Sequence, residues 1–176
     1  MPAVKTRIVI DASVLINFLN VDRLSLLRAE PNSAWTVTEH VRDELWGGTG
    51  TQRARYGTAV AGGILSETRV DLIDELLTYA EFLKLGLGRG ESATLAVAIH
   101  RNWIAALDDH TAIKKAVSLH SGIQVIRTVD IVSTAIIQGA LSVEEADAMK
   151  MVWETEHRFR LTFGSFAEIV YRDRGP

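Results

Sequence analysis

Short apolar runs alternate with longer stretches of helical periodicity along most of the chain. The short runs are rich in β-branched or aromatic residues and are bounded by polar ones, which predicts buried strands. The predicted strands cover residues 3–10, 33–38, 103–107 and 123–127. Between the strands, apolar residues recur every three or four positions, as in amphipathic helices. The predicted helices cover residues 13–30, 39–48, 71–86, 91–102, 111–122 and 129–139. Residues 51–70 show no clear pattern.

Two capping signatures mark further helices near the C-terminus. A serine followed three residues later by a glutamate satisfies backbone N–H groups at both positions, so this pair marks a helix start. Ser142 with Glu145 predicts a helix that begins at 143, and Ser165 with Glu168 predicts one that begins at 166.

The order of these elements predicts the fold class. Strands of about five residues that alternate with helices require right-handed crossovers and a mostly parallel sheet. Helices then cover both faces of that sheet. We therefore expect an α/β fold.

Composition narrows the possibilities further. The chain has 176 residues, 47% hydrophobic and 23% charged, which is typical of a single globular domain with its own core. The absence of cysteine excludes a disulfide framework, a zinc ribbon and a thiol nucleophile. The apolar run near the N-terminus is too short for a signal peptide or a membrane span, so we expect a cytoplasmic protein. With a net charge of −3, nucleic-acid binding would need a local basic surface.

Acidic residues stand where two predicted strands end. Asp11 follows the first strand, and Asp108 and Asp109 follow the strand at 103–107. Sites in open parallel sheets form beyond the carboxyl ends of the strands, so these acids should meet at one edge. Glu44, on the helix after the second strand, and Glu91, at the start of the helix before 103–107, can join them.

Such a cluster of acids indicates a metal site. Like charges repel and raise one another's pKa values, and a divalent cation removes that repulsion. Oxygen ligands suit magnesium or manganese. Acidic clusters around these ions commonly activate water against a phosphodiester.

Each acid also has a structural interpretation. Asp11 can cap the helix that follows it, and either Asp108 or Asp109 can cap the next one. Glu91 suits a helix N-terminus because of the helix dipole. Glu44 alone is typical of a solvated helical acid. Only the combination of strand-end and helix-borne acids favours a functional site.

Three segments carry a resemblance to a known family. "VIDASVLINFL", "VTEHVRDELWGG" and "GRGESATLAVAIHRNWIAALDDHTA" together resemble the PIN-domain family of metal-dependent ribonucleases, which includes VapC-type toxins. The resemblance covers residues 7–128 and looks closest to a prokaryotic PIN-like branch in which "GEGES"-type glycines precede the third acid. It implies a Rossmann-like, three-layer fold, with a C-terminal helical extension at 129–176.

The resemblance also implies a site and partners. It implies a catalytic quartet of Asp11, Glu44, Glu91 and Asp109. Asp11, Glu91 and Asp109 would hold Mg2+ or Mn2+, with Asp108 as an additional ligand, and the Ser13 hydroxyl would orient the carboxylate of Asp11. Many toxin-type relatives have aspartate where this chain has Glu91. The implied partners are RNA, a small cognate antitoxin and a second copy in a homodimer.

Three function classes follow from the sequence. The first is a metal-dependent endoribonuclease that acts as the toxin of a type II toxin–antitoxin pair. Arg89 and Lys114 would then contact RNA phosphates. The second is a non-catalytic PIN scaffold that binds RNA or protein, for which the loss of an acid would be expected. The third is another acidic α/β protein, a receiver domain or a haloacid-dehalogenase-like phosphatase. A receiver needs its acidic pair after the first strand, and the phosphatase needs a second aspartate where Ser13 stands.

Overall fold

A computed structural model describes residues 5–172 of the chain. Its centre is a five-stranded sheet in which every pairing is parallel and the order is β3-β2-β1-β4-β5. The strands are β1 (Thr6–Ile10), β2 (Ser33–Thr38), β3 (Leu65–Thr68), β4 (Ile104–Ala106) and β5 (Val125–Ile126). The predicted α/β class with a parallel sheet is confirmed. Residues 3 and 4 of the first predicted strand lie outside the described residues.

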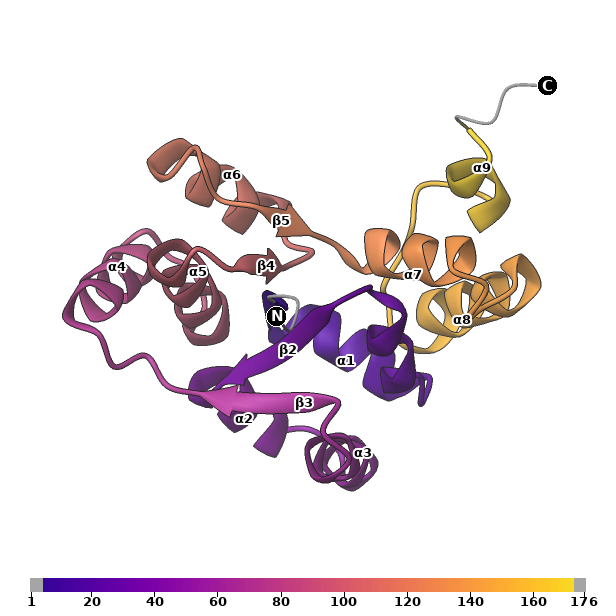
Figure 1. Cartoon of the computed structure of the whole chain (residues 1–176), viewed down its shortest axis with the longest axis horizontal. Coiled ribbons are helices and arrows are strands. Elements are labelled where there is room, and N and C mark those ends of the chain that lie inside the picture. Colours follow the sequence, from indigo (N-terminus) through magenta and orange to yellow (C-terminus); the bar gives the residue numbers. More distant parts are fainter. Residues whose placement is uncertain (1–4, 173–176) are drawn as a thin grey trace.

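Helices connect the strands and cover the sheet (Figure 1). They are α1 (Ala12–Asn20), the 3-10 helix η1 (Leu24–Ala29), α2 (Glu39–Trp46), α3 (Gly50–Ala61), α4 (Ile73–Lys84), α5 (Arg89–Arg101), α6 (His110–Leu119), α7 (Thr128–Ile137), α8 (Val143–Glu156) and α9 (Phe166–Val170). No helix in the described part of the chain is long and apolar enough to cross a membrane.

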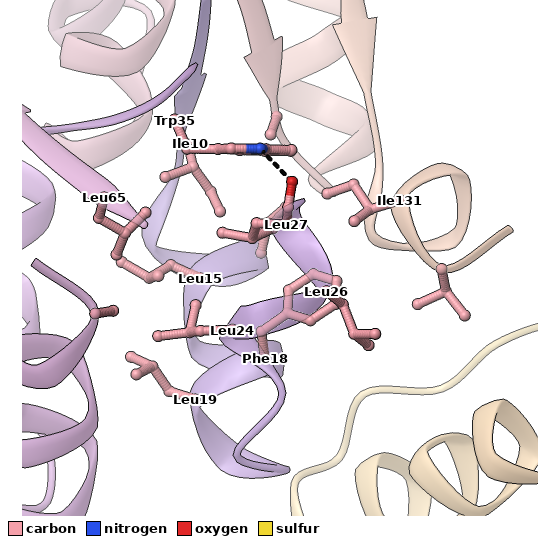
Figure 2. Close-up of a cluster of buried hydrophobic side chains, with 14 of the residues drawn as sticks. Ile10, Leu15, Phe18, Leu19, Leu24, Leu26, Leu27, Trp35, Leu65 and Ile131 are labelled. Carbon is pink, nitrogen blue, oxygen red and sulfur yellow. Dashed lines mark hydrogen bonds between the residues drawn. The ribbon is translucent and has the colours of Figure 1, made fainter. Parts of the chain in front are cut away.

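Side chains of β1 alternate between two cores, which makes three layers. Ile8 and Ile10 pack into the larger core with α1, η1, α7 and α8, whereas Val9 packs into the smaller core with α5 and α6. Figure 2 shows the larger core, where the indole Nε1 of Trp35 donates to the carbonyl oxygen of Leu27 at 2.8 Å. A buried indole needs such an acceptor. This hydrogen bond joins η1 to β2.

Two segments differ from the sequence prediction. Residues 13–30 do not form one helix, because the chain turns after α1 with Asp22 at φ 55° and continues as η1. A left-handed residue ends a helix, and aspartate adopts that conformation more readily than most. Residues 51–70, which had no clear pattern, contain α3 and β3. Ser66 and Glu67 of β3 are exposed because β3 is an edge strand, so its sequence lacks a buried apolar run.

Helix α4 forms in the predicted amphipathic segment but leaves much of its apolar side exposed. Ile73 is 76% exposed and Leu77 is 66% exposed. The buried side instead carries Glu75, whose carboxylate accepts from Arg101 Nη2 of α5 at 3.0 Å, and Phe82. Burial raises the pKa of Glu75, but the hydrogen bonds from Arg101 and from the backbone N–H groups of Leu72 and Asp71, together with the charge of Arg101, lower it below its usual value. A paired buried charge therefore fixes which side of α4 faces the protein.

Both C-terminal capping boxes are confirmed. Ser142 with Glu145 opens α8, and Ser165 with Glu168 opens α9. The indole Nε1 of Trp153 in α8 donates to the carbonyl oxygen of Asn17 in α1 at 2.7 Å. This hydrogen bond ties the C-terminal helices to α1, the helix that follows Asp11.

Candidate active site

Asp11 is the buried centre of the candidate site. It follows β1 directly, and its backbone N–H donates to the carbonyl oxygen of Ala106 in β4 at 2.9 Å. Its Oδ2 accepts from the backbone N–H of Ser13 at 3.0 Å and from the Ser13 hydroxyl at 2.6 Å, so Asp11 is also the N-cap of α1. Its Oδ1 is buried and has no hydrogen-bond partner among residues 5–172.

The environment of Asp11 disfavours its charged form. Burial raises the pKa of Asp11 from 3.8 to about 6, and the carboxylate of Glu91 adds to this increase, although the hydrogen bonds from Ser13 oppose it. An anionic carboxylate with an unpartnered buried oxygen is expensive unless a cation compensates it. The sequence had placed Asp11 and Glu91 in one cluster, and Glu91 lies close enough to act on Asp11.

Glu91 lies in the first turn of α5. Its Oε2 accepts from the backbone N–H of the N-cap residue Gly88 at 2.9 Å. The helix begins at Arg89, two residues earlier than the prediction of 91. The helix-start role expected for Glu91 is therefore present, and the charge of Glu91 also raises the pKa of Asp11.

Glu44 reaches the same helix start from α2. Its Oε1 accepts from the backbone N–H of Gly90 at 2.7 Å. A Cβ atom at Gly90 would lie 2.7 Å from this oxygen, so only glycine permits the approach. Glu44 is an exposed residue of α2, and this contact holds its carboxylate at the residue that precedes Glu91.

The two aspartates after β4 have different contacts. Asp109 is exposed and caps α6, with Oδ1 accepting from the backbone N–H of Ala112 at 2.7 Å. Asp108 is half-buried, and its oxygens accept from the Thr128 N–H at 2.9 Å, the Thr128 hydroxyl at 2.6 Å and Asn17 Nδ2 at 3.1 Å. Burial raises the pKa of Asp108, while the bonds from Thr128 and the charge of Arg127 oppose the rise.

The sequence analysis missed Asn17 and Thr128. Asn17 is buried on α1, and its Nδ2 also donates to Thr128 Oγ1 at 3.2 Å. These residues link α1, the end of β4 and the start of α7 around Asp108. A single amide in the otherwise apolar stretch "VLINFL" was the available signal, since a buried amide needs partners.

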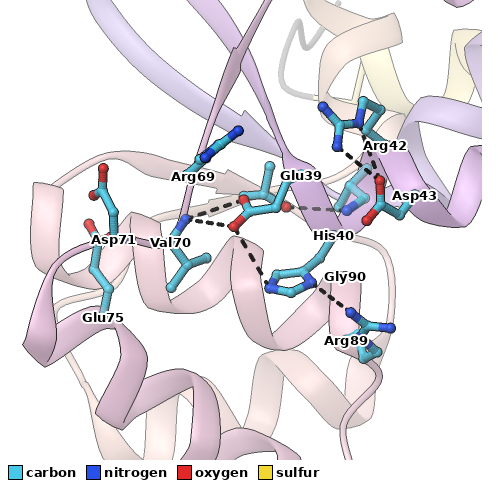
Figure 3. Close-up of polar contacts among 12 residues, drawn as sticks. Glu39, His40, Arg42, Asp43, Arg69, Val70, Asp71, Glu75, Arg89 and Gly90 are labelled. Carbon is cyan, nitrogen blue, oxygen red and sulfur yellow. Dashed lines mark hydrogen bonds and ion pairs between the residues drawn. The ribbon is translucent and has the colours of Figure 1, made fainter.

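The two predicted basic contacts lie on different helices. Arg89 begins α5, and its Nη2 lies 3.3 Å from Nδ1 of His40 at the start of α2 (Figure 3). The His40 ring stacks on Tyr79 of α4, with centroids 4.7 Å apart. Lys114 is exposed on α6, the helix that Asp109 caps.

A family model described as PIN domain matches residues 7–169, which is most of the chain. The chain belongs to the PIN domain family. PIN domains are generally nucleases and generally use divalent metals. No curated protein matches the sequence significantly.

Two solved structures are similar to this chain. A structure of VapBC2 from Rickettsia felis bound to a DNA fragment from its promoter is 15% identical, with a TM-score of 0.48, over 69% of this chain and 98% of that one. A PilT N-terminus domain protein from the archaeon Sulfolobus solfataricus P2 is 16% identical, with a TM-score of 0.49, over 74% of this chain and 94% of that one.

The donor set of this PIN domain suits a hard divalent cation, although it is not gathered into a cage. Among residues 5–172 no group of three or more His, Asp or Glu side chains stands close enough to hold a metal ion. The unpartnered Oδ1 of Asp11 is the observation that fits such an ion, because a bound cation would satisfy it and lower the pKa of Asp11. Glu91 and Glu44 each use one carboxylate oxygen for a backbone N–H, which leaves the other oxygen available to an ion.

Proposed function

We propose that this PIN domain is a Mg2+- or Mn2+-dependent endoribonuclease that hydrolyses RNA phosphodiesters. The observation that carries the proposal is the buried carboxylate of Asp11, with an unpartnered oxygen and the charge of Glu91 nearby. A carboxylate destabilised in this way is typical of functional sites. Family membership indicates the class of reaction, and Asp11 indicates where in the fold the reaction takes place.

The proposal gives each acid a task. Asp11, Glu91 and Asp109 would hold the metal, which activates water and stabilises charge on the phosphate when bound. Ser13 keeps Asp11 in one orientation through its hydroxyl. Glu44 anchors the start of α5 and completes the acidic quartet. Asp108, expected from the sequence as an additional ligand, already accepts three hydrogen bonds, so we assign it to holding β4 against α7.

Metal binding is tested by thermal unfolding. Because a cation removes the electrostatic destabilisation at Asp11, saturating Mg2+ or Mn2+ should raise the melting temperature of the wild type. Asp11→Asn, which keeps an acceptor for the Ser13 N–H, should lose most of that increase. Equal increases in both proteins would show that the ion binds elsewhere.

We further propose that the nuclease is the toxin of a type II toxin–antitoxin pair, with RNA as its substrate and a small protein as its inhibitor. The resemblance of its three motifs to the PIN-domain family, which includes VapC-type toxins, supports this proposal. Induced expression of the wild type should then arrest bacterial growth, whereas Asp11→Asn expressed to the same level should not. Arrest by both proteins would exclude toxicity through RNA cleavage.

We also propose a homodimer. The exposed apolar side of α4, formed by Ile73, Leu76 and Leu77, supports the proposal, because exposed apolar side chains gathered on one helix face favour protein contacts. A second copy can bury the same face against itself through a two-fold axis.

A further inference from the structure

A cavity of about 540 Å3 lies directly beside the acidic residues that follow β4. Asp108 and His110, the residues on either side of Asp109, belong to its lining. The other walls come from the start of α7 and from residues 159–163, between α8 and α9. Figure 1 shows these C-terminal helices gathered beyond the end of β5. The volume falls within the range of about 300–1,000 Å3 that is usual for ligand pockets.

Residues 159–163 form a fixed wall of this cavity. The backbone N–H of Phe159 donates to the Trp153 carbonyl at 3.1 Å, and the two rings meet edge to face with centroids 5.7 Å apart. The backbone N–H of Leu161 donates to Glu154 at 3.2 Å. Phe163 packs against Phe166 at 5.0 Å. Contacts along the whole segment therefore hold the wall against α8 and α9.

The walls combine cationic, acidic and aromatic side chains. The two carboxylates, Asp108 and Asp130, already accept hydrogen bonds from backbone N–H groups. Arg127 and Arg160 line the cavity from two different elements, β5–α7 and the 159–163 segment. The Nε of Arg127 is buried and has no hydrogen-bond partner within the described range. Phe159 and Phe163 are half-buried, so each retains some accessible ring surface. Guanidinium groups bind phosphate oxygens in two-point contacts. Aromatic rings stack on unpaired bases of any sequence.

We propose that this cavity binds one nucleotide of single-stranded RNA, next to the phosphodiester that is cleaved at the acidic site. Arg127 and Arg160 contact its phosphate, and Phe159 and Phe163 provide the surface for its base. The nucleotide must be unpaired because a base within an A-form duplex is stacked and cannot enter a pocket. The proposal rests on the proposed nuclease function and adds the place, formed with residues 159–163, where this chain holds the nucleotide beside the cleaved bond.

The path of the RNA over the protein follows from the position of the cavity. The cavity shares Asp108 and His110 with the loop that carries Asp109, so a nucleotide bound there places its neighbouring phosphate at the carboxyl edge of β4. RNA therefore enters over the C-terminal helices α7 to α9. The 159–163 segment therefore selects which RNA is cut and does not take part in the hydrolysis itself.

Binding to a labelled single-stranded RNA of about ten nucleotides, measured by fluorescence anisotropy in EDTA, tests the proposal without cleavage. Arg160 is exposed, so Arg160→Gln should fold normally; we expect it to weaken binding about fivefold or more. The matched control is Arg158→Gln, which removes the same charge from an exposed residue nearby that does not line the cavity. It should change the affinity by less than about twofold.

A second variant tests the aromatic wall. Phe163→Leu keeps an apolar side chain but removes the stacking surface, so it should weaken binding of the single strand about fivefold or more. It should leave the weaker binding of a perfectly paired duplex unchanged. Equal losses for single strand and duplex, in a variant with a wild-type melting temperature, would contradict stacking in the cavity.

The outcomes separate the cavity from the nuclease. Equal weakening by Arg158→Gln and Arg160→Gln would indicate general charge attraction and overturn the cavity. Unchanged binding by Arg160→Gln would also overturn the proposal that the cavity binds a nucleotide, even if the wild type cleaves RNA. The cavity would then be a candidate contact for a protein partner. Selective weakening by Arg160→Gln together with no metal-dependent cleavage by the wild type would uphold the cavity and reject the nuclease.

Discussion

Oε1 of Glu44 on α2 accepts a hydrogen bond from the backbone N–H of Gly90 on α5 at 2.7 Å. These residues are 46 positions apart, and the contact fixes the helix that carries Glu91 against the helix that carries Glu44. Any side chain at Gly90 would meet the Glu44 carboxylate, since its Cβ would lie within 2.7 to 2.9 Å of the three carboxyl atoms. The glycine therefore allows the Glu44 carboxylate to reach the start of the helix that carries Glu91.

Gly90→Ala should separate stability from activity. Alanine favours a helix by roughly 0.5–1 kcal/mol over glycine, and the Glu44 side chain can swing away, so unfolding free energy should change little. Metal-dependent RNA cleavage should fall about tenfold or more, because the displaced carboxylate no longer sits beside Glu91. Gly57→Ala, in α3 with nothing within 4 Å of the added carbon, is the matched control and should retain full activity. Full activity in Gly90→Ala would remove Glu44 from the site.

The buried carboxylate of Asp11 predicts a pH-dependent stability in the metal-free protein. Its folded-state pKa of about 6 exceeds the ordinary 3.8, so the folded protein binds the extra proton between these values. Stability attributable to Asp11 is therefore fully present below pH 3.8 and is lost as pH rises through 6. Asp11→Asn removes the loss and should be more stable than the wild type at pH 7.5 by on the order of 2–3 kcal/mol.

Urea unfolding in EDTA from pH 4 to 7.5 would measure this difference. We expect the advantage of Asp11→Asn to shrink strongly at the acidic end, where the folded carboxyl is protonated and pH approaches the ordinary pKa of 3.8. A difference between the two proteins that does not depend on pH would contradict the raised pKa. Ser13→Ala is a useful companion, because it removes a hydrogen bond that opposes the increase.

Asp109 can be separated into its structural and chemical roles. Asparagine caps helices about as well as aspartate does, whereas alanine at this position loses the cap and about 0.5–2 kcal/mol. Asp109→Asn should therefore keep the wild-type unfolding free energy and lose cleavage about a hundredfold. Asp109→Ala should lose both. Wild-type cleavage by Asp109→Asn would show that Asp109 only caps α6.

Strand-end acids were predictable because their placement follows from topology. The runs before Asp11 and Asp108 are short and apolar, and parallel pairing of β1 with β4 brings their carboxyl ends to one edge. Helix starts were predictable where a capping pair is local, as at Ser142 and Ser165. Such signals lie within a few residues of one another.

Other features depend on partners that are distant in sequence. The hydrogen bond between Asn17 and Asp108 spans 91 positions, so the amide in an apolar stretch indicates that Asn17 needs a partner but not which residue supplies it. The side of α4 that faces the protein is set by the pairing of Glu75 with Arg101, which overrides the apolar periodicity of the helix. Edge strand β3 has too little buried surface to leave an apolar pattern.

The exposed side of α4 predicts the oligomeric state. Leu77→Gln should shift the protein from dimer to monomer in light scattering coupled to size exclusion, because it removes apolar surface at the centre of the proposed interface. Lys84→Gln, at the end of the same helix, should leave the dimer intact. A wild-type protein that stays monomeric at high concentration would exclude the homodimer.

The most direct test of the central claim is single-turnover cleavage of mixed cellular RNA by the purified protein, with Mg2+ or Mn2+, after any copurifying partner has been stripped under denaturing conditions. Wild type should cleave only when the metal is present, and Asp11→Asn, folded and binding RNA with the same affinity, should be slower by about a hundredfold or more. RNA binding by the wild type with no cleavage above the Asp11→Asn protein in either metal would contradict the nuclease and identify a binding module.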